Sequence, residues 1–234
     1  MKKHIVTAVA AALATFGWPA FSEAGVTTLG SSYTVYSTSA GEEAKEYPSF
    51  TGSLVEALVE GKADEDIAVT VRRTRRKMVN GTTPVVDDQL RGTLSLKAAA
   101  AAKIALIVGV SDYGARSLSS PTKDARLLDG ILKGLGFTTT LVIDPDLAEF
   151  NAAVQSFTSA GTAPDTALVY FSGNGFQSDG QNYIVPSMEV GDGTTLQANS
   201  IAFKSLRDTI EGAFPQSVLI IDAGRSDLMA KQVR

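Results

Sequence analysis

The chain carries few side chains that could perform covalent or metal chemistry. It contains no cysteine, and its one histidine is His4. The lack of a thiol excludes every cysteine nucleophile and every thiolate metal site, and beyond His4 no imidazole is present to activate a serine in a Ser-His-Asp triad. Ser172 and Ser226 would each need a lysine or carboxylate base. We therefore expect ordinary hydroxyls that bond to nearby backbone.

Carboxylates are the other candidates, because oxygen ligands suit a hard cation such as Ca²⁺. Those that follow apolar runs or lie in turns are Asp112, Asp144, Asp179 and Asp222. Aspartate is common at such positions because it bonds to nearby backbone, and no EF-hand or phosphate-loop spacing is present. We expect structural roles for the group, no metal and no cofactor.

The charge balance argues against a nucleic-acid partner. The 234 residues include 21 basic and 25 acidic ones, for a formal net charge of −4, which is too balanced for binding a phosphate backbone. The most basic run, residues 72–77, shares a helical pattern with Ile67, Val71 and Met78 on one face. Asp64, Glu65 and Asp66 precede it, an order that complements the helix dipole. The arginines are therefore expected to form a solvated helix face.

Residues 1–24 have the layout of a secretory signal peptide, with a basic start, an apolar stretch and small residues at Ser22 and Ala24. The stretch is too short for a transmembrane helix, and no other run is long enough. The sequence thus predicts a secreted or periplasmic protein without a membrane span.

The elements that must position any site alternate between strand-like and helix-like runs, which indicates an α/β protein. Nearly continuous apolar runs predict buried parallel strands at 103–108, 138–143, 167–171 and 218–221. Helical periodicity predicts helices at 122–132, 147–157 and 203–210. The first hundred residues predict strands at 32–37 and 90–96, with helices at 50–60 and 67–79 between them.

The second half resembles the caspase-like domain of the metacaspase type. The residues that carry the resemblance are Lys103 to Gly109 with Tyr113, Pro121 with Asp124 and Ala125, Leu135 to Phe137, Tyr170 to Gly175, Asp179 and Gly180 with Asn182, Tyr183 and Pro186, and Leu219 to Arg225. The first half is similar to the segment that normally closes the same fold. The resemblance implies a three-layer α/β/α sandwich with a mostly parallel six-stranded sheet.

The resemblance also implies what has become of the catalytic pair. Asn174 stands where the family has its catalytic histidine, and Gly224 where it has its catalytic cysteine. Glycine offers no side chain, and an amide takes up no proton near neutral pH. Asp222, two residues before Gly224, corresponds to an acid that helps the family accept a basic side chain. The alternative role for Asp222 is a carboxylate that caps amides at a strand end.

The order of the halves implies a circular permutation. Residues 25–97 are equivalent to the small-subunit half and precede residues 98–234, which are equivalent to the large-subunit half. A fragment spanning two tandem copies is the alternative. In the family's strand order 2-1-3-4-5-6, the sixth strand lies four strand spacings from the first. Residues 97–103 connect these two strands and must therefore span about 19 Å at roughly 4.8 Å per spacing. Only an extended linker reaches that far, and five consecutive alanines favour helix, so a swapped homodimer stays open.

These observations predict an exported caspase-like pseudo-peptidase without a catalytic residue, a regulatory module or one that binds a peptide or protein ligand with basic residues. The alternative is a cysteine-type endopeptidase family member with basic-residue specificity or an unorthodox nucleophile. A decaying gene product without function is a third interpretation.

Overall fold

The protein is described here from a computed structural model. It describes residues 31–39, 49–78, 82–99, 102–159, 164–188, 193–224 and 226–227. The predicted signal peptide, residues 1–24, lies outside the described residues. So does the side chain of Ser226.

A six-stranded sheet forms the centre of the fold, in the order β2-β1-β9-β5-β3-β4. Its strands are β1 (Ser31–Tyr36), β2 (Val85–Asp88), β3 (Lys103–Gly109), β4 (Phe137–Ile143), β5 (Thr166–Gly173) and β9 (Gln216–Ala223). Neighbouring strands are parallel except β1 and β2, which are antiparallel. The four apolar runs of the second half are thus the parallel strands that the sequence predicts. Of these, β3, β5 and β9 are buried on both faces, as nearly continuous apolar runs require, whereas the edge strand β4 is largely half-buried or exposed.

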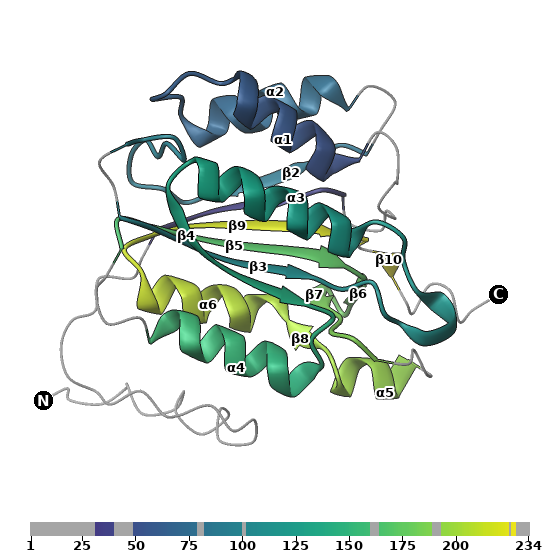
Figure 1. Ribbon diagram of the computed structural model, residues 1–234. Coiled ribbons are helices and arrows are strands. Elements are labelled where there is room, and N and C mark those ends of the chain that lie inside the picture. The colour runs from purple at the N-terminus through teal and green to yellow at the C-terminus, as the bar shows by residue number, and fades with distance from the viewer. Residues whose placement is uncertain are drawn as a thin grey trace, which may run out of the picture.

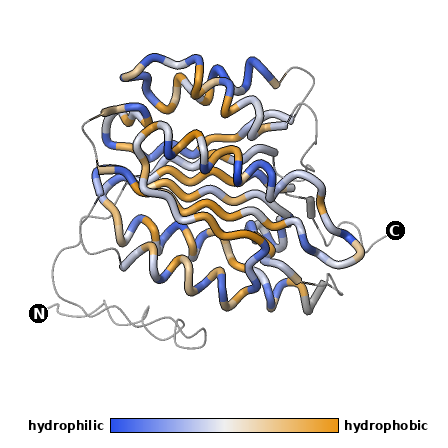
Figure 2. Tube along the Cα trace, viewed as in Figure 1, coloured by the Kyte–Doolittle hydropathy of each residue, from blue (hydrophilic) through white to orange (hydrophobic). Residues whose placement is uncertain are grey.

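Helices cover both faces of this sheet (Figure 1). On one face lie α1 (Phe50–Glu60), α2 (Ile67–Lys77) and α3 (Pro121–Gly134), and on the other α4 (Leu147–Thr158) and α6 (Phe203–Ala213). Each face has its own buried apolar cluster, and Figure 2 shows the hydrophobic residues concentrated along the central strands. The three-layer α/β/α sandwich is confirmed.

Local signals explain where the helices begin. Ser49 and Asp66 cap α1 and α2 by accepting backbone amides with their side chains, as short polar side chains do at this position. Asp146 and Glu149 form a reciprocal capping box at α4. Pro121 opens α3, where a missing amide proton costs nothing.

A second, four-stranded sheet lies at the carboxyl ends of the central strands (Figure 1). Its strands are β6 (Gly175–Ser178), β7 (Gln181–Ile184), β8 (Ile201–Ala202) and β10 (Ser226–Asp227), with the short helices η1 (Gly114–Arg116) and α5 (Gly193–Ala198) nearby. None of these elements is predicted by the sequence pattern. They are two to six residues long and mostly polar, too short for a hydrophobic period to mark them.

The pairing of β1 with β9 joins the two halves of the chain. Tyr33 pairs with Val218 and Tyr36 with Ile221, in parallel. The strand order read along the sheet is the predicted one, and it begins in the chain with the fifth strand of that order.

One predicted strand is wrong. Residues 90–96 form no strand, and the edge strand is β2, at Val85–Asp88. Leu94 and Leu96 are buried, but they lie under α2, whose Ile67 amide donates to the Leu94 carbonyl over 2.7 Å. Alternate leucines indicate burial of every second side chain, and here the core beneath a helix meets that need without a strand partner.

The connection from residue 97 to 103 is anchored by its two lysines. The Lys103 ammonium donates to the carbonyls of Leu96, Ala98 and Leu135 over 3.2, 2.9 and 2.6 Å, and Lys97 donates to the carbonyls of Leu58 and Gly61. Burial lowers the pKa of Lys103. The described residues up to Ala99 are turns or irregular backbone and form neither helix nor strand, so neither the helix that the alanines favour nor the extended linker that closure within one chain requires is seen there. Ala100 and Ala101 lie outside the described residues.

The register of β1 and β9 predicts a disulfide. Ser32 and Ser217 are paired neighbours, both are buried, and neighbouring strands lie about 5 Å apart, within disulfide reach. The variant Ser32→Cys with Ser217→Cys is expected to form an intramolecular bond on oxidation, visible as a monomer with increased mobility on a non-reducing gel.

The single variant Ser32→Cys is the control for that experiment, because the natural chain has no cysteine. A disulfide found only between chains would instead demonstrate the swapped homodimer. Failure to form either bond would contradict the pairing.

Candidate ligand-binding site at the carboxyl edge of the sheet

Asn174 and Gly224 lie next to each other at the carboxyl ends of β5 and β9. Their preceding residues, Gly173 and Ala223, are register partners. A Cβ added at Gly175 would lie 2.7 Å from the Gly224 carbonyl oxygen, so the two chain segments touch. The two sequence positions that the resemblance pairs are therefore neighbours in space.

Tyr113 holds this junction in place through hydrogen bonds of its hydroxyl. Its hydroxyl accepts the Asn174 amide over 2.8 Å and donates to the Val185 carbonyl over 2.9 Å. The side chain is only 1% exposed, and burial raises its pKa, so the hydroxyl stays a donor. The backbone at position 174 is thus held by a buried hydrogen-bonded tyrosine.

Asp222 lies on the opposite side of the sheet from the α4 and α6 layer, facing α1 and α3. Alternation along β9 places it on the same face as Val218 and Ile220, which belong to the apolar cluster under α1, α2 and α3. Its carboxylate accepts the Thr51 hydroxyl over 2.6 Å. The side chain is half-buried, and burial raises its pKa while the Thr51 hydrogen bond opposes that rise. Asp222 is therefore a partly desolvated carboxylate at the sheet edge.

A second carboxyl group, Asp124, belongs to the first turns of α3 and is also half-buried. Burial and the negative charge of Asp222 raise the pKa of Asp124 to about 6, and Lys123 opposes the rise. The two neighbouring carboxyls disfavour each other's ionisation, so a cation that binds beside them is stabilised more than it is in water.

The other residues singled out from the sequence have structural surroundings. Asp144 accepts the amides of Ser111 and Asp112 over 2.6 and 2.9 Å, in the local role expected for it. Asp179 has a φ of 50° in the turn between β6 and β7. Ser172 is buried at the end of β5. Within the described ranges, no three His, Cys, Asp or Glu side chains gather as a metal site would require.

The basic helix α2 buries one face and exposes the other. Ile67, Val71 and Met78 are buried, as predicted. Arg73 forms two bonds with Glu65, at 2.7 and 2.6 Å, and Lys77 pairs with Glu56 and Glu60. The exposed arginines are Arg72, Arg75 and Arg76. The arginine run is thus divided between ion pairs and solvent.

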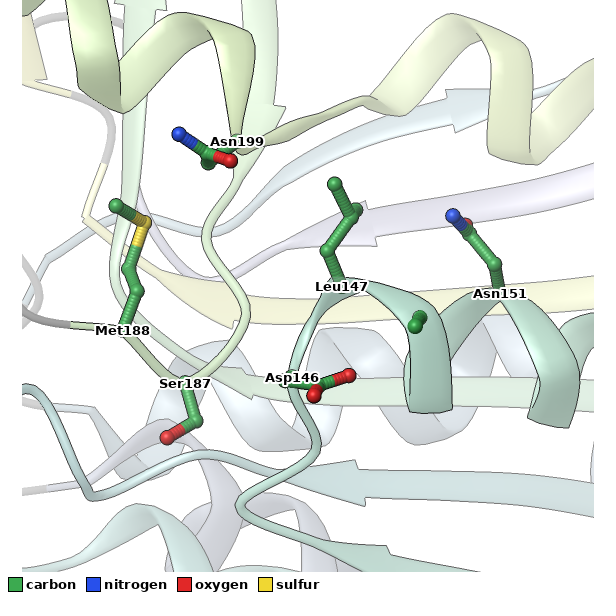
Figure 3. Close-up of a pocket in the computed structure, with 7 residues that line it drawn as sticks. Asp146, Leu147, Asn151, Ser187, Met188 and Asn199 are labelled. Atoms are coloured by element: carbon green, nitrogen blue, oxygen red, sulfur yellow. The ribbon is translucent and has the colours of Figure 1, made fainter. Parts of the chain in front are cut away.

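An open pocket of about 610 Å³ lies elsewhere, at the start of α4. Figure 3 shows the side chains that line it, which come from α4, from the segment after β7 and from the residue after α5. They include the apolar Leu147 and Met188 and the polar Asn151 and Asn199. The pocket contains none of the predicted site residues.

Sequence reasoning missed two residues that the structure joins to Asp222. Thr51 appears in it only within the helix predicted at 50–60, and Tyr170 only within the run from Tyr170 to Gly175, although their hydroxyls lie 2.5 Å apart. A signal for Thr51 was available, because the predicted strand order places the start of a helix at 50 next to the end of the strand at 218–221. A polar residue in the first turn of that helix would face the strand end.

The second half of the chain matches a known protein family. A family model described as Caspase domain matches residues 102–234, more than half of the chain. The crystal structure of protein GSU0716 from Geobacter sulfurreducens is similar over 56% of this chain and 54% of its own, with 20% sequence identity and a TM-score of 0.44. The chain thus spans about half the length of that protein. No curated protein matches the chain.

Proposed function

Because the chain belongs to the caspase-domain family of peptidases and yet has no cysteine and no histidine beyond His4, we propose that it is a non-catalytic member that binds peptides or proteins through a basic side chain. Asp222 is the residue that receives this side chain. The observation that carries the proposal is the pair of partly buried carboxyls, Asp222 and Asp124, beside the junction of Asn174 and Gly224.

Loss of cleavage follows from the residue types. A cysteine peptidase needs a thiolate and a base, and the positions that correspond to them hold Gly224 and Asn174. Ser172 is buried and lacks an imidazole to activate it. Family membership alone would favour the alternative, an active endopeptidase, but this chain has neither the thiol nor, beyond His4, the imidazole of a cysteine peptidase.

Binding can persist after catalysis is lost, because the strand ends that shape a ligand site stay in place. A guanidinium bound to a partly desolvated carboxylate contributes about 1.5–3 kcal/mol, roughly ten- to a hundred-fold in affinity. The raised pKa of Asp124 adds a pH dependence. Below about pH 6 Asp124 carries a proton, and above it Asp124 contributes a negative charge beside Asp222 that attracts a cation more strongly.

We further propose that the protein is exported and that its domain is circularly permuted. Residues 1–24 support export through their signal-peptide pattern. The pairing of β1 with β9 and the strand order support the permutation.

Calorimetry with three short peptides that differ only in one central Arg, Lys or Gln tests the binding proposal. We expect the Arg and Lys peptides to bind at least ten-fold more tightly than the Gln peptide, and affinity to increase as the pH rises through about 6. Asp222→Asn should remove the difference. Mass spectrometry should recover every peptide intact.

Asp64→Asn is the matched control, because Asp64 is exposed in the loop before α2 and the substitution changes the net charge equally. Equal affinity for the three peptides, or an unchanged preference in Asp222→Asn, would contradict the proposed site. Cleavage that survives repurification would contradict the non-catalytic role and support the peptidase alternative.

A further inference from the structure

Three side chains from three elements form a continuous chain of hydrogen bonds that ends at Asp222. The Tyr170 hydroxyl, on β5, lies 2.5 Å from the Thr51 hydroxyl, on α1. The Thr51 hydroxyl lies 2.6 Å from Oδ2 of Asp222, on β9. Tyr170 and Thr51 are both fully buried.

The direction of these bonds follows from proton counting. An ionised carboxylate can only accept hydrogen bonds, so the Thr51 hydroxyl uses its single proton to donate to Asp222. The Thr51 oxygen then accepts from Tyr170. Burial and the charge of Asp222 raise the pKa of Tyr170 well above its usual range, which keeps the tyrosine a donor. Both bonds therefore point toward the carboxylate.

The chain of hydrogen bonds acts differently on the two carboxyls. A hydrogen bond from Thr51 stabilises the anion of Asp222. Burial raises the pKa of both carboxyls, that of Asp124 to about 6 with a further contribution from the charge of Asp222. Only Asp222 receives the opposing hydrogen bond from Thr51, which favours its ionised form.

We infer that Thr51 is a positioning residue, supported by Tyr170, which holds the Asp222 carboxylate ionised and oriented toward the carboxyl edge of the sheet for a basic ligand side chain. The inference rests on the proposed binding function and deepens it. It also gives the first half of the chain a part in the site, because Thr51 precedes Asp222 by 171 residues.

The groups that face Asp222 come from every neighbouring element. They are Thr51 from α1, Tyr170 from β5, Asp124 from α3, Ser37 from the end of β1, and Ser172, the register partner of Asp222 on β5. The Ser37 hydroxyl is buried and lies close enough to Asp222 to lower the pKa of that carboxyl. Lys123, on α3, is the cation that acts on Asp124.

Carboxyl titration by carbon-13 NMR, without any peptide, tests this arrangement first. Thr51→Val keeps the side-chain shape and removes the hydroxyl, so the pKa of Asp222 is expected to rise by about one unit. Thr51→Ser retains the hydroxyl and should leave the titration near that of the natural protein. Tyr170→Phe removes the outer bond and should produce a smaller rise.

Peptide binding then connects the chain to ligand recognition. Thr51→Val should bind the Arg peptide about ten-fold more weakly at pH 6, with a smaller loss at pH 8, because a higher pH favours the ionised form of Asp222 even when the hydroxyl is absent. Thr51→Ser should bind normally. A purely structural role for Thr51 would weaken binding equally at both pH values.

The outcomes separate the two proposals. No preference for the Arg peptide in the natural protein would overturn the proposed function, whatever the titration shows. An Arg preference in the natural protein together with an unshifted Asp222 titration in Thr51→Val would overturn the positioning role alone. If Thr51→Val does not fold, the shift expected in Tyr170→Phe decides in the same way, and its absence contradicts the inference.

Discussion

Leu106→Ala is expected to lower the free energy of unfolding by about 3–5 kcal/mol, the range typical for a fully buried leucine that leaves a cavity. Leu106 is 0% exposed at the middle of β3, and β3 lies between β4 and β5. Its neighbours in the sheet, Thr140 and Val169, belong to strands that cannot collapse onto the space. Urea denaturation followed by circular dichroism measures the change.

Leu127→Ala is the matched control, because it removes the same atoms from a side chain that is 47% exposed on α3. That variant should lose less than about 1 kcal/mol. Similar losses in the two variants would mean that β3 is not buried between β4 and β5.

Gly173→Ala is expected to destabilise the protein by about 2–3 kcal/mol, within the range for overpacked cores. A Cβ at this position would lie 2.5 Å from the Tyr113 hydroxyl and 2.9 Å from Cζ of Phe171. Tyr113 has little freedom to move away, because its hydroxyl bonds to both Asn174 and Val185. The substitution should also disturb the junction next to Asn174, seen as changed amide shifts by NMR.

Gly130→Ala is expected to stabilise the protein, in contrast to Gly173→Ala. Gly130 lies inside α3, and a Cβ there meets nothing within 4 Å. Alanine at such a helical position stabilises by about 0.5–1 kcal/mol. If both alanine variants are stabilised, the close contact between Gly173 and Tyr113 is wrong.

The central strands could be predicted because their sequence signal is strong. Lys103–Gly109, Thr166–Gly173 and Gln216–Ala223 are buried on both faces, and a parallel strand covered on both sides must be apolar nearly throughout. The helix at Pro121–Gly134 could also be predicted, because it has a proline at its start and a glycine at its end.

The edge strand and the small sheet could not be predicted in the same way. Val85–Asp88 has only exposed or half-buried residues, so its pairing with β1 depends on backbone bonds that any sequence can make. Leu94 and Leu96 gave a stronger strand signal, yet their burial is under α2. Hydrophobic pattern reports burial, and it does not say which element provides the cover.

The sequence by itself determined which chemistry this protein has available. With no cysteine and a single histidine at position 4, composition excludes thiolate chemistry and limits imidazole chemistry to His4, since no fold can provide a missing functional group. It also determined the buried strands, because a nearly continuous apolar run has few other stable uses.

Only the tertiary structure decided the environment of the remaining carboxylate. Thr51, Asp124, Tyr170 and Asp222 are spread over 172 residues of the chain, and their contacts depend on how α1 and α3 pack on the ends of β5 and β9. The charge state of Asp222 depends on burial and on a hydroxyl 171 residues away. Such energies arise from distances in space, which neither composition nor periodicity encodes locally.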